Sequence, residues 1–249
     1  MMKIFVGFDD TDVLGSPIGT GKLARYFAKK VPADCSLWGV VRYQLLVADE
    51  VPYTSHNSSA CVIIEAPEAS YTEKFVELGV QHLAEYYCEG SDPGLCVAAE
   101  GAVSQEQIVF GQECTARLKT QDEAMRIAKG VHLSGHGGTN DGIIGAAAAI
   151  GLTAGGWCGR FIELGSRKLR DFPSRVQVKE LQDAGIIPLS IDRNATVPMP
   201  EDFVETKDWL RPRLWSGRPM LPMELRGEGL WESLGGKSKK AKNIDYDEE

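Results

Sequence analysis

Three aspartates stand within four residues near the start of the chain: Asp9, Asp10 and Asp12. They follow an apolar, β-branched stretch at residues 3–8, so they are expected at the C-terminal end of a strand. Side chains alternate along a strand, which would put Asp10 and Asp12 on one face and Asp9 on the other. Magnesium prefers oxygen ligands, usually one or two protein carboxylates completed by phosphate and water. The cluster therefore predicts a magnesium site with catalytic aspartates; the alternative is a turn with a helix cap, where Asp is also common.

A glycine-containing loop and a lysine follow the aspartates, a pattern that suggests a phosphate-binding loop. A Walker A loop needs two glycines separated by four residues, then Lys, then Ser or Thr. Here Gly15 and Gly21 enclose five residues and Leu23 follows Lys22, so the Walker A interpretation fails twice. Lys22 is still expected one turn into a helix over residues 21–30, where its ammonium group would reach phosphate.

The same aspartates approximate the D-x-D-x-T or D-x-D-x-V motif of HAD-type phosphatases. Asp10 and Asp12 supply the two acids, but Leu14 stands where Thr or Val is required. If the aspartates and the glycine-containing loop bind ATP and magnesium, the protein would be an ATP-dependent transferase or synthetase. Two other functions stay open. One is a magnesium-dependent phosphohydrolase with an aspartyl nucleophile, and the other is a nucleotide-binding regulatory module without turnover.

A second glycine-rich segment, SGHGGTNDG at residues 134–142, leads into the small-residue stretch GIIGAAAAIG. A helix that begins there would offer backbone amides and a favourable dipole to a phosphate group. The residues expected on the nucleotide side of this helix start are Gly137, Gly138, Asn140, Gly142 and Gly145. The alternative is a surface loop, because glycine-rich turns also form for conformational reasons alone.

Composition and charge limit the classes of function. The chain is 43% hydrophobic and 25% charged, with no apolar run near the roughly 20 residues that span a bilayer. Acidic residues near the N-terminus interrupt any signal peptide, so a cytoplasmic protein without membrane contact is expected. Six cysteines form no CxxC pair, which argues against a thiolate metal site. With a net charge of -8, binding to tRNA is expected to be weak at best.

One basic run stands out in this acidic chain. Its members are Arg160, Arg167, Lys168, Arg170 and Arg175. Such a run either balances phosphate charge or forms the solvated face of a helix, and charge runs are more often solvated faces.

The apolar pattern predicts an α+β protein that begins with the order βαββαβ, the order of ferredoxin-like folds. In this first region, strands are expected at 3–8, 36–47, 59–66 and 94–99, and helices at 21–30 and 68–87. In the second region, strands are expected near 107–110, 157–164 and 187–191, with helices near 121–128, from 142 and around 176–184. The predicted domains are a ferredoxin-like half at 1–100, a second α/β half at 101–232, and a disordered tail at 233–249.

Several segments together resemble the archaeal agmatidine synthetases, which modify the wobble cytidine of an isoleucine tRNA. In chain order they are GFDDTD (7–12), LLVADEVPYTSHNSSACVI (45–63), DPGLCVA (92–98), GIIGAAAAIG (142–151), IELGSR (162–167) and LRGE (225–228). The resemblance implies a kinase-like domain that binds ATP and magnesium beside a ferredoxin-like domain, so the two halves here would form one ATP-binding unit. In that family ATP activates a carbonyl oxygen of the cytidine, which agmatine then displaces.

The resemblance also implies residue roles. Asp9, Asp10 and Asp12 would take the metal and phosphate roles, Thr20 would be the family threonine after the loop, Gly142 and Gly145 would open the Gly-rich helix, and Arg167 falls in a matching segment.

Departures from the family pattern limit what is carried over. Gly21 and Lys22 replace a tyrosine and a threonine, and Asp141 stands where the family has an arginine. The family chain continues into an OB-fold and a zinc ribbon, whereas this sequence of 249 residues is expected to lack both and has no CxxC pair. The predicted function is therefore an ATP- and magnesium-dependent phosphotransferase or synthetase. It would act on a carbonyl or hydroxyl oxygen of a nucleoside or small-molecule acceptor.

Overall fold

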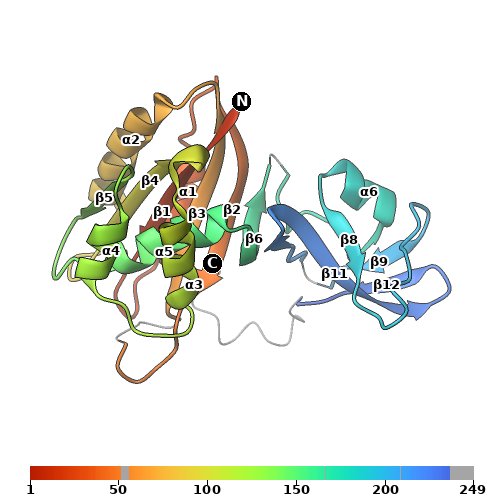
Figure 1. Cartoon of the computed structure of the whole chain (residues 1–249). Coiled ribbons are helices and arrows are strands. Elements are labelled where there is room, and N and C mark those ends of the chain that lie inside the picture. Colours follow the sequence, from red (N-terminus) through yellow and green to blue (C-terminus); the bar gives the residue numbers. More distant parts are fainter. Residues whose placement is uncertain (52–55, 166, 208, 236–249) are drawn as a thin grey trace.

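The computed structural model describes residues 1–51, 56–165, 167–207 and 209–235. Two lobes lie side by side and are joined by strands of one sheet (Figure 1). The sheet order is β5-β4-β1-β3-β2-β6-β10-β11-β12-β9-β7, with β8 beside β11. None of the helices in the described residues combines the length and apolarity needed to cross a bilayer. Most of the tail expected at 233–249 lies outside the described residues, which end at 235.

The first lobe begins with the expected order of elements. The strands are β1 (Met2–Asp9), β2 (Ser36–Gln44), β3 (Ser58–Ala66) and β4 (Gly94–Ala99), and the helices are α1 (Thr20–Ala28) and α2 (Tyr71–Tyr86). The strands lie in the order β4-β1-β3-β2, and all neighbours are antiparallel. Both helices cover one face, where Phe8, Leu23 and Phe75 belong to one buried cluster. The βαββαβ order predicted from the apolar pattern is thus confirmed.

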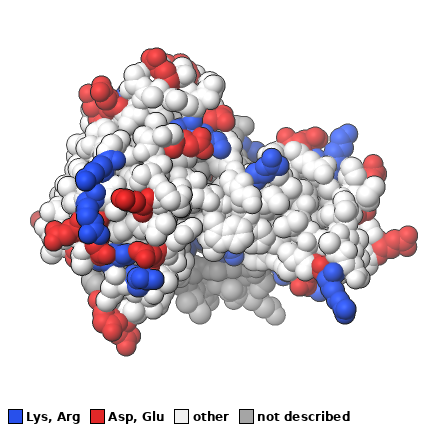
Figure 2. All heavy atoms as spheres, in the orientation of Figure 1, with Lys and Arg blue, Asp and Glu red and all other residues white. Residues whose placement is uncertain are grey.

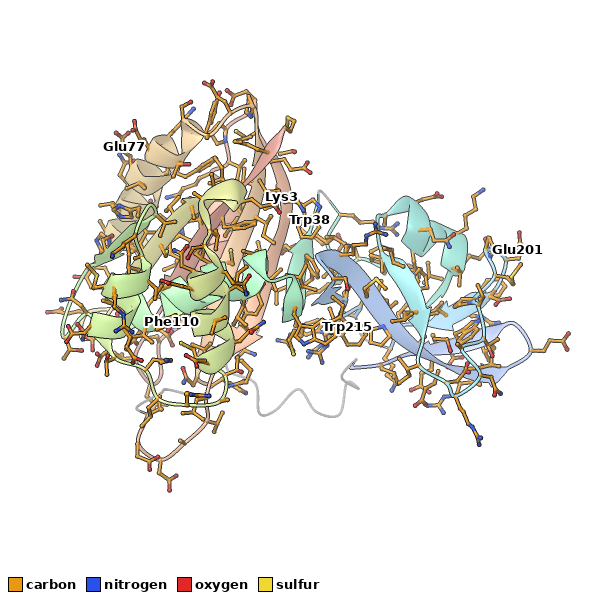
Figure 3. The ribbon with its side chains drawn as sticks, in the orientation of Figure 1. Lys3, Trp38, Glu77, Phe110, Glu201 and Trp215 are labelled. Carbon is orange, nitrogen blue, oxygen red and sulfur yellow. The ribbon has the colours of Figure 1, made fainter. Side chains whose placement is uncertain are left out.

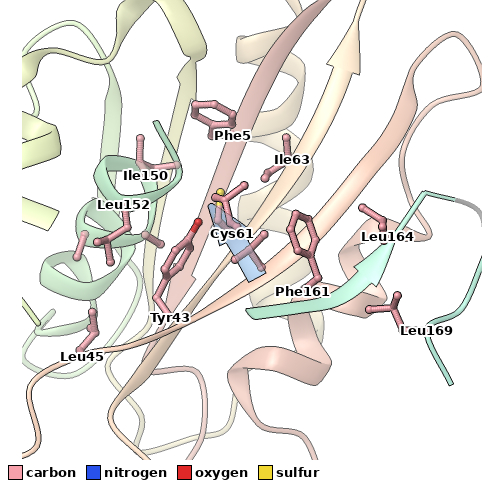
Figure 4. Close-up of a cluster of buried hydrophobic side chains, with 14 of the residues drawn as sticks. Phe5, Tyr43, Leu45, Cys61, Ile63, Ile150, Leu152, Phe161, Leu164 and Leu169 are labelled. Atoms are coloured by element: carbon pink, nitrogen blue, oxygen red, sulfur yellow. The ribbon is translucent and has the colours of Figure 1, made fainter. Parts of the chain in front are cut away.

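The opposite face of this sheet is covered by helices from the second predicted region. They are α3 (Gln105–Glu113), α4 (Gln121–Ile127) and α5 (Gly142–Ala154), preceded by the short 3₁₀ helix η1 (Glu100–Ala102). β5 (His132–Gly135) extends the sheet beside β4, and β6 (Trp157–Leu164) extends it beside β2. Side chains of α5 and of the sheet fill a second buried cluster that includes Phe5, Ile63 and Ile150 (Figure 4).

The strand expected near residues 107–110 is wrong, because this segment lies inside helix α3. Ser104 caps the helix: its hydroxyl accepts a bond from the backbone N–H of Gln107 (3.2 Å), and its own N–H donates to Gln107 Oε1 (2.7 Å). This reciprocal cap satisfies two amides at the helix start. Phe110 is buried against the core, so the apolar run that suggested a strand is one side of a helix.

The second lobe is a small sheet with one short helix. Its elements are β7 (Arg175–Gln177), α6 (Val178–Asp183), β8 (Ile187–Ser190), β9 (Phe203–Glu205), β10 (Arg213–Trp215), β11 (Arg218–Gly227) and β12 (Leu230–Ser233). The helix expected around 176–184 starts at Val178, because Val176 pairs with Val204 in the sheet. β10 pairs with β6, which carries the sheet from one lobe into the other.

Helix α5 lies unusually close to the first sheet because glycines face one another. A Cβ atom placed on Gly94 of β4 would lie 2.1 Å from the carbonyl carbon of Gly142 in α5. One placed on Gly7 of β1 would lie 2.5 Å from the Ala146 carbonyl oxygen. Backbone therefore packs on backbone here, and a side chain would push the helix away.

We expect Gly142→Ala to destabilise the protein by about 1–3 kcal/mol, the usual cost of overpacking. The added methyl group would lie 2.3 Å from the Asp92 carbonyl oxygen and 2.6 Å from the Gly94 nitrogen. The free energy of unfolding in urea measures the effect, with Gly101→Ala as the control because its added methyl meets open space. Equal stability of the two variants would contradict a requirement for close packing.

Candidate functional site

The aspartate cluster opens into a pocket of about 570 Å³ at the C-terminal end of β1. Segments far apart in sequence form its walls: residues 9–14, the start of α1, residues 45–51 and 56–58, 90–92, 114–119 and the first turn of α5. Five of the residues predicted for the site line it, namely Asp9, Asp10, Asp12, Thr20 and Gly145. The structure thus brings together residues from four of the six segments that resemble the family, at 7–12, 45–63, 92–98 and 142–151.

Asp9 is the last residue of β1 and faces the first turn of α5. A Cβ atom placed on Gly145 would lie 1.7 Å from Asp9 Oδ2, so only glycine leaves room for this carboxylate. Burial, and next the charge of Asp10, raise the pKa of Asp9 from 3.8 to about 8. A carboxylate with so high a pKa holds a proton at neutral pH unless a cation is bound nearby.

Asp10 turns the chain out of the strand. Its backbone φ is 50°, in the left-handed region that non-glycine residues rarely occupy. Burial, followed by the charges of Asp92, Asp12 and Asp141, raises the pKa of Asp10 from 3.8 to about 6. The strand alternation expected for the three aspartates does not hold, because β1 ends at Asp9 and all three side chains line one pocket.

Asp12 is positioned by two buried threonines. Thr20 is the first residue of α1, and its hydroxyl donates to Asp12 Oδ1 (3.4 Å). Thr11 donates in turn to the hydroxyl of Thr20 (3.1 Å). Both threonine side chains are almost fully buried, so this short chain of hydrogen bonds orients the Asp12 carboxylate toward the pocket.

Asp92 lines the pocket as well, although the sequence reasoning did not single it out. Its carboxylate accepts hydrogen bonds from the backbone N–H and the hydroxyl of Thr139, both at 2.8 Å. Gly138 has a φ of 54°, and a Cβ atom there would lie 1.4 Å from Asp92 Oδ1. The glycine loop therefore wraps around Asp92. Its place in the family-like segment DPGLCVA was the available sequence signal.

The remaining residues expected beside phosphate have structural partners. Gly137, Gly138, Asn140 and Gly142 do not line the pocket. The Gly142 N–H donates to the Asp92 carbonyl oxygen (3.0 Å), so this helix amide already has a protein acceptor. Asn140 has a φ of 67°, and its carboxamide lies against Gly135. These residues shape the loop that holds Asp92.

The two cations predicted for the site lie elsewhere. Lys22 Nζ donates to the Pro17 carbonyl oxygen (3.3 Å), and Lys22 does not line the pocket. The Arg167 guanidinium lies 3.7 Å from the ring centre of Phe172 at the start of the second lobe. Arg117 and Lys119 line the pocket instead, and sequence analysis gave no signal for either.

The pocket cations differ in how they are held. Lys119 forms ion pairs with Glu113 (2.6 Å) and Glu123 (2.9 Å), and these pairs raise the pKa of Lys119. Arg117 forms a longer pair with Glu113 (3.4 Å), and 67% of its side chain is exposed. A pocket lined by carboxylates and by an exposed guanidinium suits a polyphosphate that carries its own cation.

The pocket suits magnesium better than a metal that needs a complete protein shell. Within the described ranges, no three His, Cys, Asp or Glu side chains are grouped closely enough to hold a metal ion. Magnesium usually takes only one or two protein carboxylates and completes its shell with phosphate and water. Asp9 and Asp10, whose pKa values are raised by burial and by the charges of neighbouring carboxylates, are the carboxylates that a cation would relieve most.

Comparison with protein-family models and with curated proteins finds no match. Among solved structures, the fold is shared with enzymes that act on tRNA, at a level of identity that establishes the fold alone. One is TiaS, an agmatidine synthetase for an isoleucine tRNA, in its complex with that tRNA and ATP: the TM-score is 0.51 and identity 23%, over 61% of this chain and 36% of that one. For a tRNA fluorescent labeling enzyme the TM-score is 0.50 and the sequence identity 24%, and the match covers 60% of this chain and 36% of that enzyme. The resemblance to agmatidine synthetases is therefore confirmed for the fold.

We expect the metal-free protein to lose stability as pH rises from about 4 to about 8. In this window folded Asp9, with a pKa of about 8, keeps a proton that the unfolded carboxyl, with a pKa near 3.8, has lost. The folded state then binds more protons, so the free energy of unfolding falls with rising pH. Thermal midpoints in EDTA near both ends of the window test this, and Asp9→Asn is expected to flatten the dependence. An unchanged slope in Asp9→Asn would show that another group causes it.

Proposed function

We propose that this protein is an ATP-dependent synthetase that uses magnesium in the aspartate pocket. The observation that carries the proposal is that Asp9, Asp10, Asp12, Asp92 and Asp141 line one pocket together with the cations Arg117 and Lys119. The fold similarity supports it, because the TiaS structure of that fold is a complex with ATP. The acceptor class we propose is a nucleoside or small molecule with a carbonyl or hydroxyl oxygen.

The fold supports a two-part organisation of the site. We infer that residues 1–100 form a ferredoxin-like unit, since strands β4-β1-β3-β2 carry both helices on one face. Residues 101–232 supply α3, α4 and α5 to the other face. The first region contributes Asp9 to Thr20 and the second contributes Arg117 and Gly145, so the proposed kinase-like unit needs both.

The chain's own groups would bind ATP in a defined orientation. Asp9 and Asp10 would hold magnesium, which when bound neutralises phosphate charge as the phosphoryl group transfers. Thr20 holds Asp12 in place, so that its carboxylate keeps its direction when the pocket fills. Arg117 lines the pocket with most of its side chain exposed, free of the double ion pairing that holds Lys119, and is the cation we assign to the phosphates.

The two other functions raised by the sequence differ in their products. A phosphohydrolase with Asp10 as nucleophile would release phosphate from ATP or a phosphoester without any acceptor, and beryllofluoride would trap its aspartyl adduct. A regulatory module would bind ATP and form no product over a broad panel of amines and nucleosides. Product formation that requires both ATP and an acceptor distinguishes the synthetase from both.

ATP binding is expected to require a divalent cation. Six carboxylates line the pocket, those of Asp9, Asp10, Asp12, Glu50, Asp92 and Asp141. Together they would repel the ATP polyanion, and a bound cation reverses this repulsion. Calorimetric titration of ATP with magnesium and then in excess EDTA measures the difference. An affinity for ATP that is as high in EDTA as in magnesium would contradict binding through a bridging metal ion.

Asp10→Asn is expected to lower ATP turnover by roughly a hundredfold or more, the scale at which one preorganised electrostatic group contributes to catalysis. The variant is expected to fold, because it removes a negative charge that is repelled by Asp92, Asp12 and Asp141. Turnover and thermal midpoint are measured together, with Asp183→Asn at the end of α6 as the matched control outside the pocket. Near-normal turnover in Asp10→Asn, or unfolding as its main defect, would make the aspartates a structural turn.

A further inference from the structure

Two tryptophans form a stacked pair where the lobes meet. Trp157 at the start of β6 is paired with Trp215 at the end of β10, with ring centres 5.9 Å apart and ring planes inclined by 25°. Trp157 is 52% exposed, although aromatic side chains of this size are usually well covered. Figure 3 shows Trp215 at the junction of the two lobes. Trp215 is half-buried, so the stacked pair offers mainly the exposed ring of Trp157 to a ligand.

A row of arginines borders this pair. Arg213 lies two residues before Trp215 on β10, so both side chains emerge on one face. Paired residues share a face, which adds Arg218 opposite Trp215, Arg160 opposite Arg213, and Arg42 opposite Arg160. We call this set the Trp–Arg surface: Trp157, Trp215, Arg218, Arg213, Arg160 and Arg42.

The Trp–Arg surface continues across the sheet toward the aspartate pocket. Arg42 pairs with Ala60 of β3, and Ala60 pairs with Phe8, the residue before Asp9. The Nε of Arg42 donates to the Ser58 hydroxyl (3.0 Å), and Ser58 lines the pocket. The arginine row and the pocket therefore lie at the same end of the first sheet.

The other arginines of the basic run have a different role. The guanidinium groups of Arg167, Arg170 and Arg175 lie over the rings of Phe172, Trp209 and Phe203 within the second lobe. On the face drawn in Figure 2, basic and acidic side chains of the described residues are interspersed. In a chain with net charge -8, an arginine row beside two tryptophans is thus a local feature that general charge does not account for.

We propose that the Trp–Arg surface binds single-stranded nucleic acid, with bases stacked on Trp157 and Trp215 and phosphates held by Arg213 and Arg218. Every base has a π face, so stacking on aromatic side chains tolerates many sequences. Guanidinium groups match the geometry of phosphate oxygens. A duplex hides its base faces inside the stack and satisfies only half of this surface. The proposal concerns a site separate from the ATP pocket and does not rest on ATP turnover.

The test is fluorescence anisotropy with a labelled single-stranded oligoribonucleotide of about ten nucleotides, within the span of one aromatic-lined site. We expect salt-sensitive binding that Trp157→Ala weakens about tenfold. Arg218→Gln is expected to weaken binding and to reduce the salt slope by about one. The matched controls in the same lobe are Leu225→Ala, an exposed apolar residue of β11, and Arg175→Gln, whose guanidinium lies on Phe203.

Three outcomes overturn the proposal. One is binding that Trp157→Ala and Arg218→Gln leave unchanged; another is a duplex that binds as tightly as the single strand. The third is a dimer in analytical ultracentrifugation that Trp157→Ala dissociates, because a second copy would then cover the surface. Asp10→Asn separates this proposal from the ATP site: it should retain oligonucleotide binding, whereas Trp157→Ala should retain ATP binding.

Discussion

The close approach of α5 to the first sheet is the contact on which the candidate site depends. Glycines at positions 7, 94, 142 and 145 let the backbone of the first half of this helix lie directly against strands β1 and β4 and the Asp9 carboxylate. The first turn of α5 therefore reaches the end of β1, where Asp9 lies against Gly145. Bulkier residues would lift the helix and separate Asp141 from the other carboxylates. The small-residue segment of the sequence is in this sense part of the site.

Much of the fold was predictable because its signals are local. The βαββαβ order followed from runs of apolar residues, and strand β6 was expected at the residues where it lies. The segment at 107–110 failed because three apolar residues in succession suit a strand or a buried helix equally well. The cap formed by Ser104 and Gln107 decides for the helix, and its Ser-x-x-Gln pattern was readable in the sequence. Short strands such as β9 and β10 were missed because three residues carry too little periodicity.

Only some of the site residues could be predicted from the sequence, because the partners of long side chains depend on tertiary contacts. Asp9, Asp10, Asp12, Thr20 and Gly145 were foreseen and do meet in one pocket. Lys22 was expected near phosphate, but its ammonium bonds to the Pro17 carbonyl oxygen close by in the chain. Asp92 and Arg117 lie in loops that are distant in sequence from the three aspartates, so no spacing pattern predicted that they line the pocket. Asp92 acquires its position from Thr139, a contact that exists only after the glycine loop has folded around it.

Strand β6 is hydrogen-bonded along both edges, to β2 in the first lobe and to β10 in the second. A hinge motion between the lobes at β6 would break hydrogen bonds of one of these two ladders, so the sheet holds the lobes in a fixed relative position. The sheet also fixes the distance between the aspartates and the tryptophans. From β1, which ends in the aspartates, to β6, which begins with Trp157, the order β1-β3-β2-β6 contains three strand spacings. At about 4.8 Å each these amount to about 14 Å, a separation set by backbone hydrogen bonds and independent of side-chain rotamers.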